Sequence, residues 1–480
     1  MRAVNTASTQ VTAVLAGDTA NQCLAVAHRG EAILICPLER WRRRRGSHEV
    51  FGRDLVRSAM ATLLPEQDIP TCDPELFDVT GDADATTEAL LAAARLYAGH
   101  QPGHALISRG ISGMEWWAFT PESATLTRRI DGPAPDVVIA RFAGALGLSH
   151  LPPTQVEALG RWGEPLMVDE VHAALEHDGL DALARHLHDA DHKRHADAIC
   201  SVQQVLAARV ASLVTNVSHP VVLLGDVFLN SYFTTVVAAA LGAPGHDVAI
   251  IVPPDPGAGA IAVGGLAARG ALSVPPSPFA GPSANVTETK LALDRCKLTY
   301  EFLNEAGCVT RATEALRRGR LVAWFEQGME WGPRALGHRS IFADASNPYV
   351  LENLNVYLKK RPAFMSYALS IRASQTAAWV DGPTHSRGMQ YQYTAREPGR
   401  FAQFLPRATQ PFRVHTVDDD GSSIAQLIRA FEVETGLPYL ANTSFNAITE
   451  PLVATPTDAI RCFFGSGLDL LIMNGLVVTK

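Results

Sequence analysis

The chain has 480 residues, of which 47% are hydrophobic and 19% charged. That length exceeds what one hydrophobic core usually supports, so we expect two domains or three. The formal net charge of −8 disfavours a nucleic-acid partner, because phosphate backbones attract basic proteins. The sequence has no apolar run long enough to cross a bilayer and no CxxC pair, so we expect a cytoplasmic protein with no membrane partner.

The N-terminal part opens with predicted strands. Residues 11–17 read as a buried strand, and residues 23–38 read as a hairpin that turns at Arg29 and Gly30. Apolar spacing predicts helices over residues 87–97 and 196–214, with poorly patterned sequence between them. The histidine-rich stretch 186–195 carries as many Asp, Arg and Lys residues as histidines, which favours a solvated helix face over a metal-binding tract.

Two strand–glycine loop–helix units follow. Residues 219–224 read as a strand that leads into the loop Gly225–Asn230, and residues 248–252 read as a strand that leads into a loop at Asp255. Such loops bind phosphate groups because glycine lets backbone N–H groups approach a ligand at a helix N-terminus. Neither loop has Walker spacing, and many such turns bind nothing, so each loop alone is a weak signal.

A stretch rich in proline, serine and glycine at residues 271–285 marks the predicted domain boundary. We expect one domain over residues 1–275, a linker over 276–300 and a second domain over 301–480. The second domain again reads as α/β. Its expected elements are helices over 309–318, around Leu351–Leu358, over 422–431 and from a cap at Thr455 or Thr457, and strands over 321–325, 341–343, 412–417 and 470–473.

The loop Gly328–Ser340 carries the strongest chemical signal. Arg334 and Arg339 lie among three glycines and one proline, beside Glu330 and Ser340. The planar arginine fork suits phosphate or carboxylate oxygens, and a preorganised loop lets several donors converge. The Lys359-Lys360-Arg361 string either adds charge to the same site or complements the dipole of a helix C-terminus.

These strings resemble a known family. GMEWGPRALGHRSIFADA (residues 328–345), the KKR string and ANTSFNAITEPLVATPTDAIRCF (residues 441–463) resemble the O-carbamoyltransferases of natural-product and nodulation-factor biosynthesis. Tobramycin and cephamycin carbamoyltransferases belong to that family. The resemblance is dense over residues 321–480 and looser through GDVFLN and PPDPGAGAIAVGG.

The resemblance implies an α/β (α+β) fold with two parts: an N-terminal actin/sugar-kinase/heat-shock-ATPase-like (RNase H-like) domain and a C-terminal YrdC-like domain. It implies an enzyme that converts carbamoyl phosphate and ATP into carbamoyl adenylate, and then transfers the carbamoyl group to a hydroxyl of a small-molecule acceptor. The implied catalytic residues are Asp18, Arg334 and Arg339. The implied carbamoyl phosphate and ATP ligands are Glu330, Ser340, Lys360, Arg361, Asn442, Ser444 and Asn446, and the implied N-terminal nucleotide site comprises Gly225, Asp226, Asn230 and Gly257.

The family's HHxxH metal motif has a partial counterpart. His100 and His104 keep the i, i+4 spacing, and Asp255 is the matching carboxylate, so a divalent iron or magnesium ion is an implied cofactor. Pro102 and Gly103 are poor helix formers between the two histidines. The alternative is therefore a pair of polar loop histidines.

Three further family motifs are altered. The HDAS histidine, a candidate general base, is absent from residues 17–20, although Asp18 remains. An arginine of FRPFAP is replaced by Met365, and an arginine of ARxQ, aligned with residues 423–426, is replaced by Ile424. Each lost arginine would remove a charge-assisted contact of roughly 1.5 to 3 kcal/mol.

The sequence leaves two alternatives to this function. One is an acyl-adenylate-forming homologue with a different acyl donor or an amine acceptor. The other is a catalytically weakened homologue that binds nucleotide and acts as a regulatory subunit. A tRNA-modifying threonylcarbamoyl synthase relative is disfavoured by the net charge of −8.

Overall fold

The computed structural model describes residues 11–17, 22–42, 56, 58–60, 75–79, 82–177, 179–214, 217, 219–242, 248–448 and 450–480. The chain divides into two compact units, and both units take segments from the two halves of the sequence. Unit 1 contains Met1–Gln101, Pro253–Lys360 and Val417–Lys480, and unit 2 contains Pro102–Val252 and Arg361–Thr416. The linear boundary at residues 276–300 stays a prediction, and part of that stretch forms helix α11 (Val286–Arg295).

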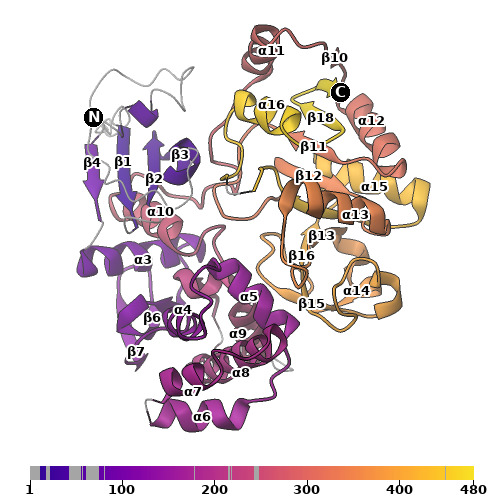
Figure 1. The fold of residues 1–480 in the computed structure, drawn as a ribbon. Helices are drawn as coiled ribbons and strands as arrows, with labels where there is room; N and C mark the ends of the chain where they lie inside the picture. The colour runs from indigo at the N-terminus through magenta and orange to yellow at the C-terminus, as the bar shows by residue number, and fades with distance from the viewer. Residues whose placement is uncertain are drawn as a thin grey trace, which may run out of the picture. The chain divides into compact units, whose positions relative to one another are not determined.

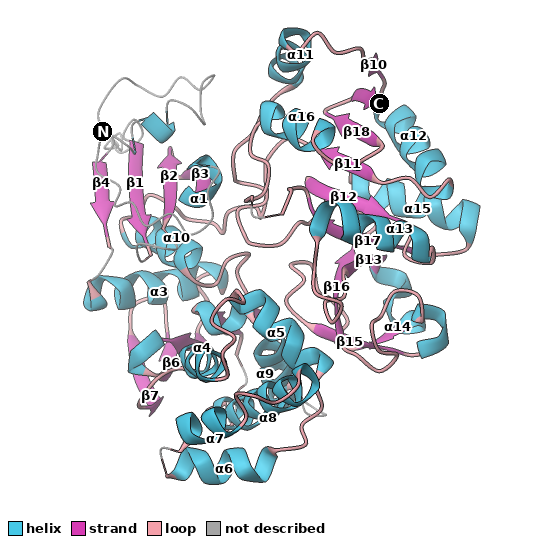
Figure 2. Cartoon of the chain, in the orientation of Figure 1, coloured by secondary structure: helices cyan, strands magenta, loops and turns pink. Residues whose placement is uncertain are grey.

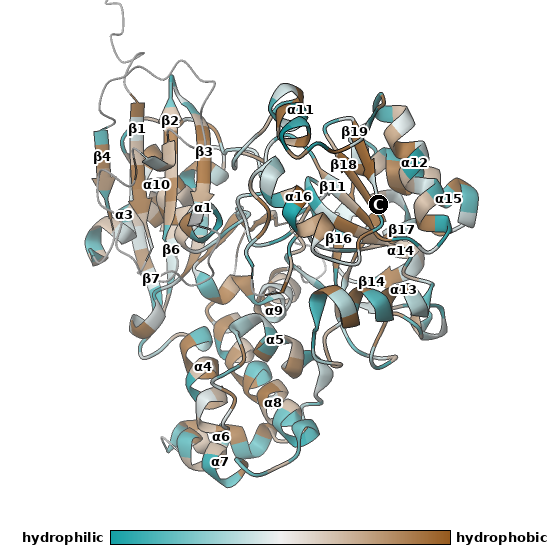
Figure 3. Cartoon of the chain, turned by 45° about the horizontal axis from the view of Figure 1, so that its top comes forward, coloured by the Kyte–Doolittle hydropathy of each residue, from teal (hydrophilic) through white to brown (hydrophobic). Residues whose placement is uncertain are grey.

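The first sheet of unit 1 has the order β3-β2-β1-β4 (Figure 1). In the predicted hairpin, β3 pairs antiparallel with β2. Strand β2 also pairs antiparallel with β1, and β4 runs parallel to β1. Arg29 and Gly30 form the predicted turn, both with positive φ. Figure 3 shows β1, β2 and β3 as mostly hydrophobic, as expected for strands whose two faces both lie in apolar cores. The bounds are β1 Val11–Ala16, β2 Cys23–His28, β3 Glu31–Pro37, α1 Leu38–Arg42 and β4 Glu75–Asp78.

Helix α10 (Ala258–Ala268) packs closely against α3 (Ala83–Tyr97) and β1. A Cβ at Gly264 would lie 1.8 Å from the carbonyl oxygen of Ala89, and a Cβ at Gly265 would lie 2.7 Å from Cγ1 of Val14. Glycine is therefore required at these two positions within α10, where the helix closely approaches α3 and β1.

The sheet of unit 2 has the order β7-β6-β5-β8-β9. Strands β5, β6 and β7 are antiparallel neighbours, and β8 and β9 continue parallel to β5. In the first sheet, likewise, β1, β2 and β3 are antiparallel neighbours and β4 continues parallel to β1. The bounds are β5 Gly103–Ser108, β6 Met114–Phe119, β7 Ala124–Ile130, α4 Pro135–Ala145, α5 Pro153–Trp162, α6 Val168–Glu176, α7 Leu180–His186, α8 His192–Ala211, β8 Val221–Leu224, α9 Ser231–Leu241 and β9 Ile250–Ile251.

Unit 1 also contains the strand order β10-β19-β18-β11-β12-β17 (Figure 2). Helices α12 and α15 bury one apolar face each in a core with these strands. The predicted cap at Thr455 is confirmed, because its side chain accepts a hydrogen bond from the N–H of Asp458. The bounds are β10 Glu301–Phe302, α12 Glu305–Arg317, β11 Val322–Phe325, β12 Arg339–Ala343, α13 Pro348–Asn353, α15 Ser423–Thr435, β17 Tyr439–Ser444, α16 Pro456–Phe464, β18 Leu470–Met473 and β19 Leu476–Thr479.

The C-terminal segment of unit 2 supplies the order β13-β16-β15-β14. Strand β15 is hydrogen-bonded to the N-terminal part of the same unit: the N–H of Gln392 donates to Oγ1 of Thr235 at 2.8 Å. The bounds are β13 Ala368–Arg372, α14 Thr376–Trp379, β14 Val380–Asp381, β15 Gln392–Ala395 and β16 Phe412–Val417. Unit 2 therefore includes a segment from the second half of the sequence that packs on its N-terminal part.

The mixed α/β prediction is confirmed, and the histidine-rich stretch is exposed at His186, His188 and His192, as the solvated-face prediction expects. Asn442, an implied ligand, lies inside strand β17. His195 is buried, and its Nε2 lies 2.8 Å from the carbonyl oxygen of Leu187, so the histidine-rich stretch is not wholly solvated. The poorly patterned region holds strands β5–β7 and helices α4–α7. Among the described residues, none of the helices combines the length and apolar character needed to cross a membrane.

We predict that Gly264→Ala destabilises the protein by at least about 1–3 kcal/mol, because the new methyl group would overlap the Ala89 carbonyl. The matched control is Gly144→Ala on helix α4, where a Cβ meets nothing within 4 Å. That change should be neutral or should stabilise by up to about 1 kcal/mol. Equilibrium unfolding in urea measures both, and equal effects would contradict the packing argument.

Candidate functional site

The buried carboxylate of Glu330 shapes the loop Gly328–Ser340. Its Oε1 accepts hydrogen bonds from the backbone N–H groups of Leu336 at 2.7 Å, His338 at 2.9 Å and Arg339 at 3.2 Å. Glu330 is completely buried. Three backbone donors that would otherwise lack partners therefore converge on one charged acceptor, which holds the loop in one conformation.

The buried side chain of Arg339 also stabilises this loop, through hydrogen bonds to backbone carbonyl oxygens. Its Nη1 donates to the carbonyl oxygens of Glu326 and His338, and its guanidinium lies 3.5 Å from the ring centroid of Phe325. Burial lowers the pKa of Arg339 to about 9, although the carboxylates of Glu330 and Glu326 favour its charged form. The side chain stays protonated at neutral pH, and its role at a ligand stays a prediction.

Arg334 lies at the middle of the loop and is partly exposed. Ser340 is buried, and its Oγ accepts a hydrogen bond from the N–H of Gly337 at 3.0 Å. Strand pairing sets Ser340 opposite Ser444 and Phe342 opposite Asn442. The structure thus brings together the two predicted strings, which are about a hundred residues apart in the chain, on neighbouring strands β12 and β17.

Lys359 contacts the second string, whereas the sequence resemblance pointed to Lys360. Nζ of Lys359 donates to the carbonyl oxygens of Ser444 at 2.5 Å and Asn446 at 2.9 Å, and to Oδ1 of Asn446 at 2.7 Å. Lys360 is exposed and adopts a left-handed backbone conformation with φ of 43°. The position of Lys359 in its helical turn could have indicated this choice. Lys359 directly follows the buried Leu358, and both lie on the inward face of the π-helical turn Leu354–Lys359.

Arg361 lies in unit 2, where its guanidinium stacks over the ring of Tyr367 at 4.5 Å. Ile424 lies in the hydrophobic core with α12 and α15, and it also packs against the arginine loop, because a Cβ at Gly337 would lie 3.2 Å from its Cδ1. The loss of a family arginine at this position stays a prediction.

The second glycine loop packs against the Glu330 loop inside unit 1. Both oxygens of the half-buried Asp255 carboxylate accept backbone N–H groups, from Gly257 at 3.0 Å and Gly259 at 3.1 Å. A Cβ at Gly259 would lie 2.5 Å from the ring of Trp331. Burial raises the pKa of Asp255, and these hydrogen bonds together with Arg40 oppose the rise.

Two other segments anchor the Glu330 loop. The Arg40 guanidinium, from helix α1, donates to the backbone carbonyl oxygens of Glu330 and Gly332. The predicted linker runs beside the loop, since the N–H of Gly281 donates to Met329 and the N–H of Trp331 donates to Pro278. Residues far before the loop therefore help to hold it.

The first glycine loop lies in unit 2. Gly225 has a φ of 106°, and a Cβ there would lie 2.6 Å from Cβ of Ser108. Asn230 caps helix α9 by accepting the N–H of Tyr232 at 3.0 Å, and Asp226 is exposed. These contacts explain the glycine and the asparagine structurally, and the nucleotide role of Gly225, Asp226, Asn230 and Gly257 stays a prediction.

The metal prediction does not fit the residues present. His100 lies in a turn with φ of 57°, and His104 lies on strand β5, so the two are not one helical turn apart on a helix face. His104 instead stacks on Trp116 at 5.0 Å, and burial lowers its pKa. Within the described ranges, no three His, Cys, Asp or Glu side chains gather into a metal site. Pro102 and Gly103 break the helix that the motif needs. Asp18 lies outside the described residues.

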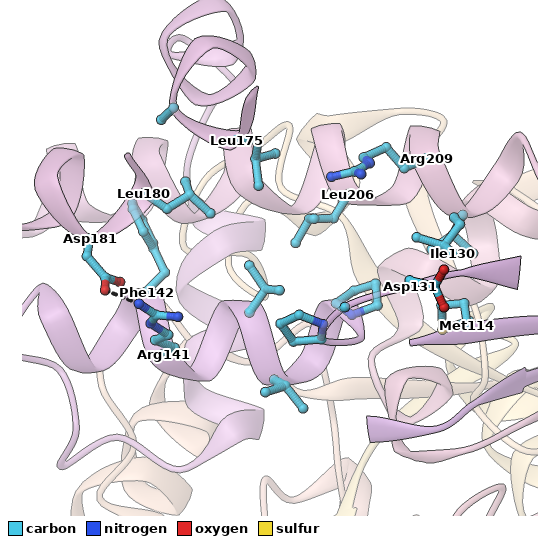
Figure 4. A pocket seen from close by; sticks show the side chains of 17 residues that line it. Met114, Ile130, Asp131, Arg141, Phe142, Leu175, Leu180, Asp181, Leu206 and Arg209 are labelled. Atoms are coloured by element: carbon cyan, nitrogen blue, oxygen red, sulfur yellow. Dashed lines mark hydrogen bonds and ion pairs between the residues drawn. The ribbon is translucent and has the colours of Figure 1, made fainter. Parts of the chain in front are cut away.

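Unit 2 also contains a cavity of about 470 Å³ (Figure 4). Apolar side chains from α4, α6, α7 and α8 line it, including Phe142, Leu175 and Leu206. Arg141 pairs with Asp181 at one end, as the dashed line in Figure 4 shows. Its volume is in the range of small-molecule sites.

An α/β domain built around an arginine loop thus occupies the C-terminal part of the chain. Residues 313–480 match the family described as Carbamoyltransferase C-terminus. Nodulation protein NolO of Bradyrhizobium diazoefficiens is 29% identical over 211 residues, covering 43% of this chain and 38% of that protein. The 3'-hydroxymethylcephem-O-carbamoyltransferase of Amycolatopsis lactamdurans is 29% identical over 161 residues, covering 33% of this chain and 31% of that protein.

An uncharacterized protein of Synechocystis sp. is 31% identical over 215 residues, covering 40% of this chain and 35% of that protein. The chain therefore spans about a third of the length of these curated relatives. Among solved structures, the activator of the 2-hydroxyisocaproyl-CoA dehydratase from Clostridium difficile is 12% identical with a TM-score of 0.35, covering 55% of this chain and 95% of that chain.

We predict that Glu330→Ala destabilises the protein by at least about 3 kcal/mol, because each of three buried N–H groups loses its acceptor at about 1–3 kcal/mol. Glu330→Gln keeps an accepting oxygen and should cost clearly less. Urea unfolding of both variants measures the difference. Equal losses would show that the carboxylate does not organise the loop.

Proposed function

We propose that the protein is an O-carbamoyltransferase that activates carbamoyl phosphate with ATP and transfers the carbamoyl group to a hydroxyl of a small-molecule acceptor. The observation that carries the proposal is the family match over residues 313–480, which contains the preorganised Arg334 loop. The name of the cephem relative describes carbamoyl transfer to the oxygen of a hydroxymethyl group. That chemistry supports an alcohol acceptor here.

In the proposed activation step, one water is consumed and both phosphate and pyrophosphate leave. Water displaces phosphate from the carbamoyl carbon, and the resulting carbamate oxygen attacks the α-phosphorus of ATP and displaces pyrophosphate. Charge builds up on phosphate oxygens in both displacements, so fixed cationic donors stabilise the transition states. The loop supplies such a donor at Arg334, and we assign Arg339 and Glu330 to positioning it.

The remaining predicted residues divide into ligands and supports. We assign Ser340, Asn442, Ser444 and Asn446 to the same substrate oxygens, with Lys359 holding the Ser444–Asn446 backbone in place. Arg361, in unit 2, is assigned to anionic groups of the substrates. An YrdC-like fold for the activating domain is part of this proposal.

In the proposed transfer step, the acceptor oxygen attacks the carbamoyl carbon, its C–O bond to the adenylate breaks, and AMP leaves. A base must take the hydroxyl proton, and Asp18 is the assigned base since the family histidine is absent. The residues that the structure describes do not fit a metal ion, so no step passes through one. The cavity of unit 2 is large enough for a small-molecule acceptor.

Two alternatives to this proposal have distinct outcomes. Turnover with another acyl phosphate or with an amine acceptor would favour an altered acyl-adenylate enzyme, consistent with Met365 at a family arginine position. Tight nucleotide binding without turnover would favour a regulatory homologue. Both alternatives keep the fold described above.

We predict that Arg334→Ala lowers the release of phosphate and pyrophosphate from carbamoyl phosphate and ATP by at least about a hundredfold, because a fixed charged donor is lost. Arg318→Ala, an exposed arginine at the end of α12, is the matched control and should keep wild-type activity. Coupled assays for phosphate and pyrophosphate measure both. Full activity of Arg334→Ala would place the site elsewhere.

We predict that Lys359→Met raises the KM for carbamoyl phosphate more than Lys360→Met does, because only Lys359 binds the Ser444–Asn446 backbone in the described structure. The loss of three charge-assisted hydrogen bonds should cost at least about tenfold in kcat/KM. The same coupled assays decide between the lysines, and a larger effect at Lys360 would restore the sequence assignment.

A further inference from the structure

The cavity of unit 2 begins next to the carboxyl edge of the sheet in that unit. Met114 and Ile130 line it and pair in register on β6 and β7, and Met114 also pairs with Ser108, the last residue of β5. The first glycine loop lies against Ser108, because a Cβ at Gly225 would be 2.6 Å from Cβ of Ser108. Strands β5 and β8 are parallel, and α/β proteins bind ligands outside the carboxyl ends of such strands. The cavity therefore lies near the edge where this class of sheet binds ligands.

The walls of the cavity leave apolar side chains only partly covered. Val138 on α4, Leu175 on α6 and Leu180 on α7 pack against the core of unit 2 but are only half-buried. The buried Phe142 and Leu206 complete the wall from α4 and α8. Protein interiors are close-packed, so an opening of about 470 Å³ between helices leaves apolar surface in contact with water. A ligand with an apolar body would remove that surface from water.

The charged side chains that line the cavity differ in their pairing. Arg141 forms an ion pair with Asp181. Asp131 is also paired, since its Oδ1 lies 2.7 Å from Nε of Arg129. Within the described part of the chain, the guanidinium of Arg209 makes no ion pair and no hydrogen bond. Figure 4 shows Arg209 away from the Arg141–Asp181 pair, so its positive charge is available to a ligand in the cavity.

The ligand that complements this lining has an apolar ring and one negative charge. An exposed arginine is solvated by water and by itself indicates no ligand, but Arg209 borders an apolar wall whose other charges are neutralised. The planar guanidinium fork matches the two oxygens of a carboxylate. The single charge of a carboxylate also balances the single free arginine, which a phosphate dianion does not. Phe142 offers an aromatic ring to a ring of the ligand.

We propose that the cavity binds a small molecule with an apolar ring and one carboxylate group, the ring against Phe142 and Leu175 and the carboxylate on Arg209. The inference goes beyond the proposed function, because binding in the cavity does not require carbamoyl transfer. It assigns a ligand chemistry to a site that lies apart from both the arginine loop and the residues of the first glycine loop.

The test is calorimetric titration of the 480-residue chain with para-coumarate, an aromatic acid that also carries a free hydroxyl group. We expect saturable binding of one molecule per chain. Arg209→Gln removes the charge at an exposed position, so the variant should fold normally and bind at least about tenfold more weakly, the loss of one charge-assisted hydrogen bond. Methyl para-coumarate has no charge, and it should bind wild-type protein and Arg209→Gln equally.

Two further variants locate the site. Arg185→Gln changes an exposed arginine on α7 outside the lining, and it should bind para-coumarate like the wild type. Ala174→Phe places a phenyl group in the cavity from a half-buried lining position, and it should weaken the binding of both the acid and the ester. An unchanged melting temperature shows that the Ala174→Phe variant keeps its fold.

Three results would each overturn the inference: no binding by wild-type protein up to about 1 mM, equal binding of the acid by wild type and Arg209→Gln, or undiminished binding by folded Ala174→Phe. None of them concerns the proposed function, which the release of phosphate and pyrophosphate tests separately.

Product analysis distinguishes two sources of such a ligand. With carbamoyl phosphate and ATP present, mass spectrometry detects whether the hydroxyl group of para-coumarate is carbamoylated. A carbamoylated product supports the inference with the acceptor as the ligand. Arginine-dependent binding without that product supports it with a ligand that does not react.

Discussion

The structure of the C-terminal part depends on one buried carboxylate. Glu330 accepts three backbone N–H groups of its own loop, and its backbone carbonyl accepts the guanidinium of Arg40. Its neighbour Trp331 fills the space that only a glycine at position 259 leaves open. The position of Arg334 follows from these contacts, because the arginine lies on the same closed loop. An acid side chain thus sets the conformation of the loop that carries Arg334.

Unit 2 uses the same physical device in a different place. The Glu157 carboxylate pairs with Arg161 and Arg413 and accepts a hydrogen bond from Ser231 at the start of α9. Similarly, the Glu330 carboxylate accepts three backbone N–H groups, and the backbone carbonyl of Glu330 accepts the Arg40 guanidinium of α1. In both cases, a carboxylate taken out of water gathers several donors, which compensates its desolvation and leaves cationic groups in defined directions. Activation chemistry on phosphates benefits from such preorganised charge because little reorganisation remains for the transition state.

Sequence patterns located the elements with regular spacing. The strand at residues 11–16, the hairpin at Arg29–Gly30 and the apolar face of α8 are all present. Strand β7 was missed because most of its side chains are exposed, which removes the alternation that marks a strand. Helices α6 and α7 are short and leave few buried residues to define a period. The i, i+4 histidines failed as a metal pair because spacing implies proximity only on an intact helix.

The sequence by itself determined the family of residues 313–480, the arginine loop and the need for glycine where backbones approach closely. Only the tertiary structure decided which charged groups point inward: Arg339 rather than Arg334, and Lys359 rather than Lys360. The physical reason is that burial and pairing depend on segments far apart in the chain. A residue such as Glu157 has no local pattern, and its role arises from the side chains that the fold brings to it.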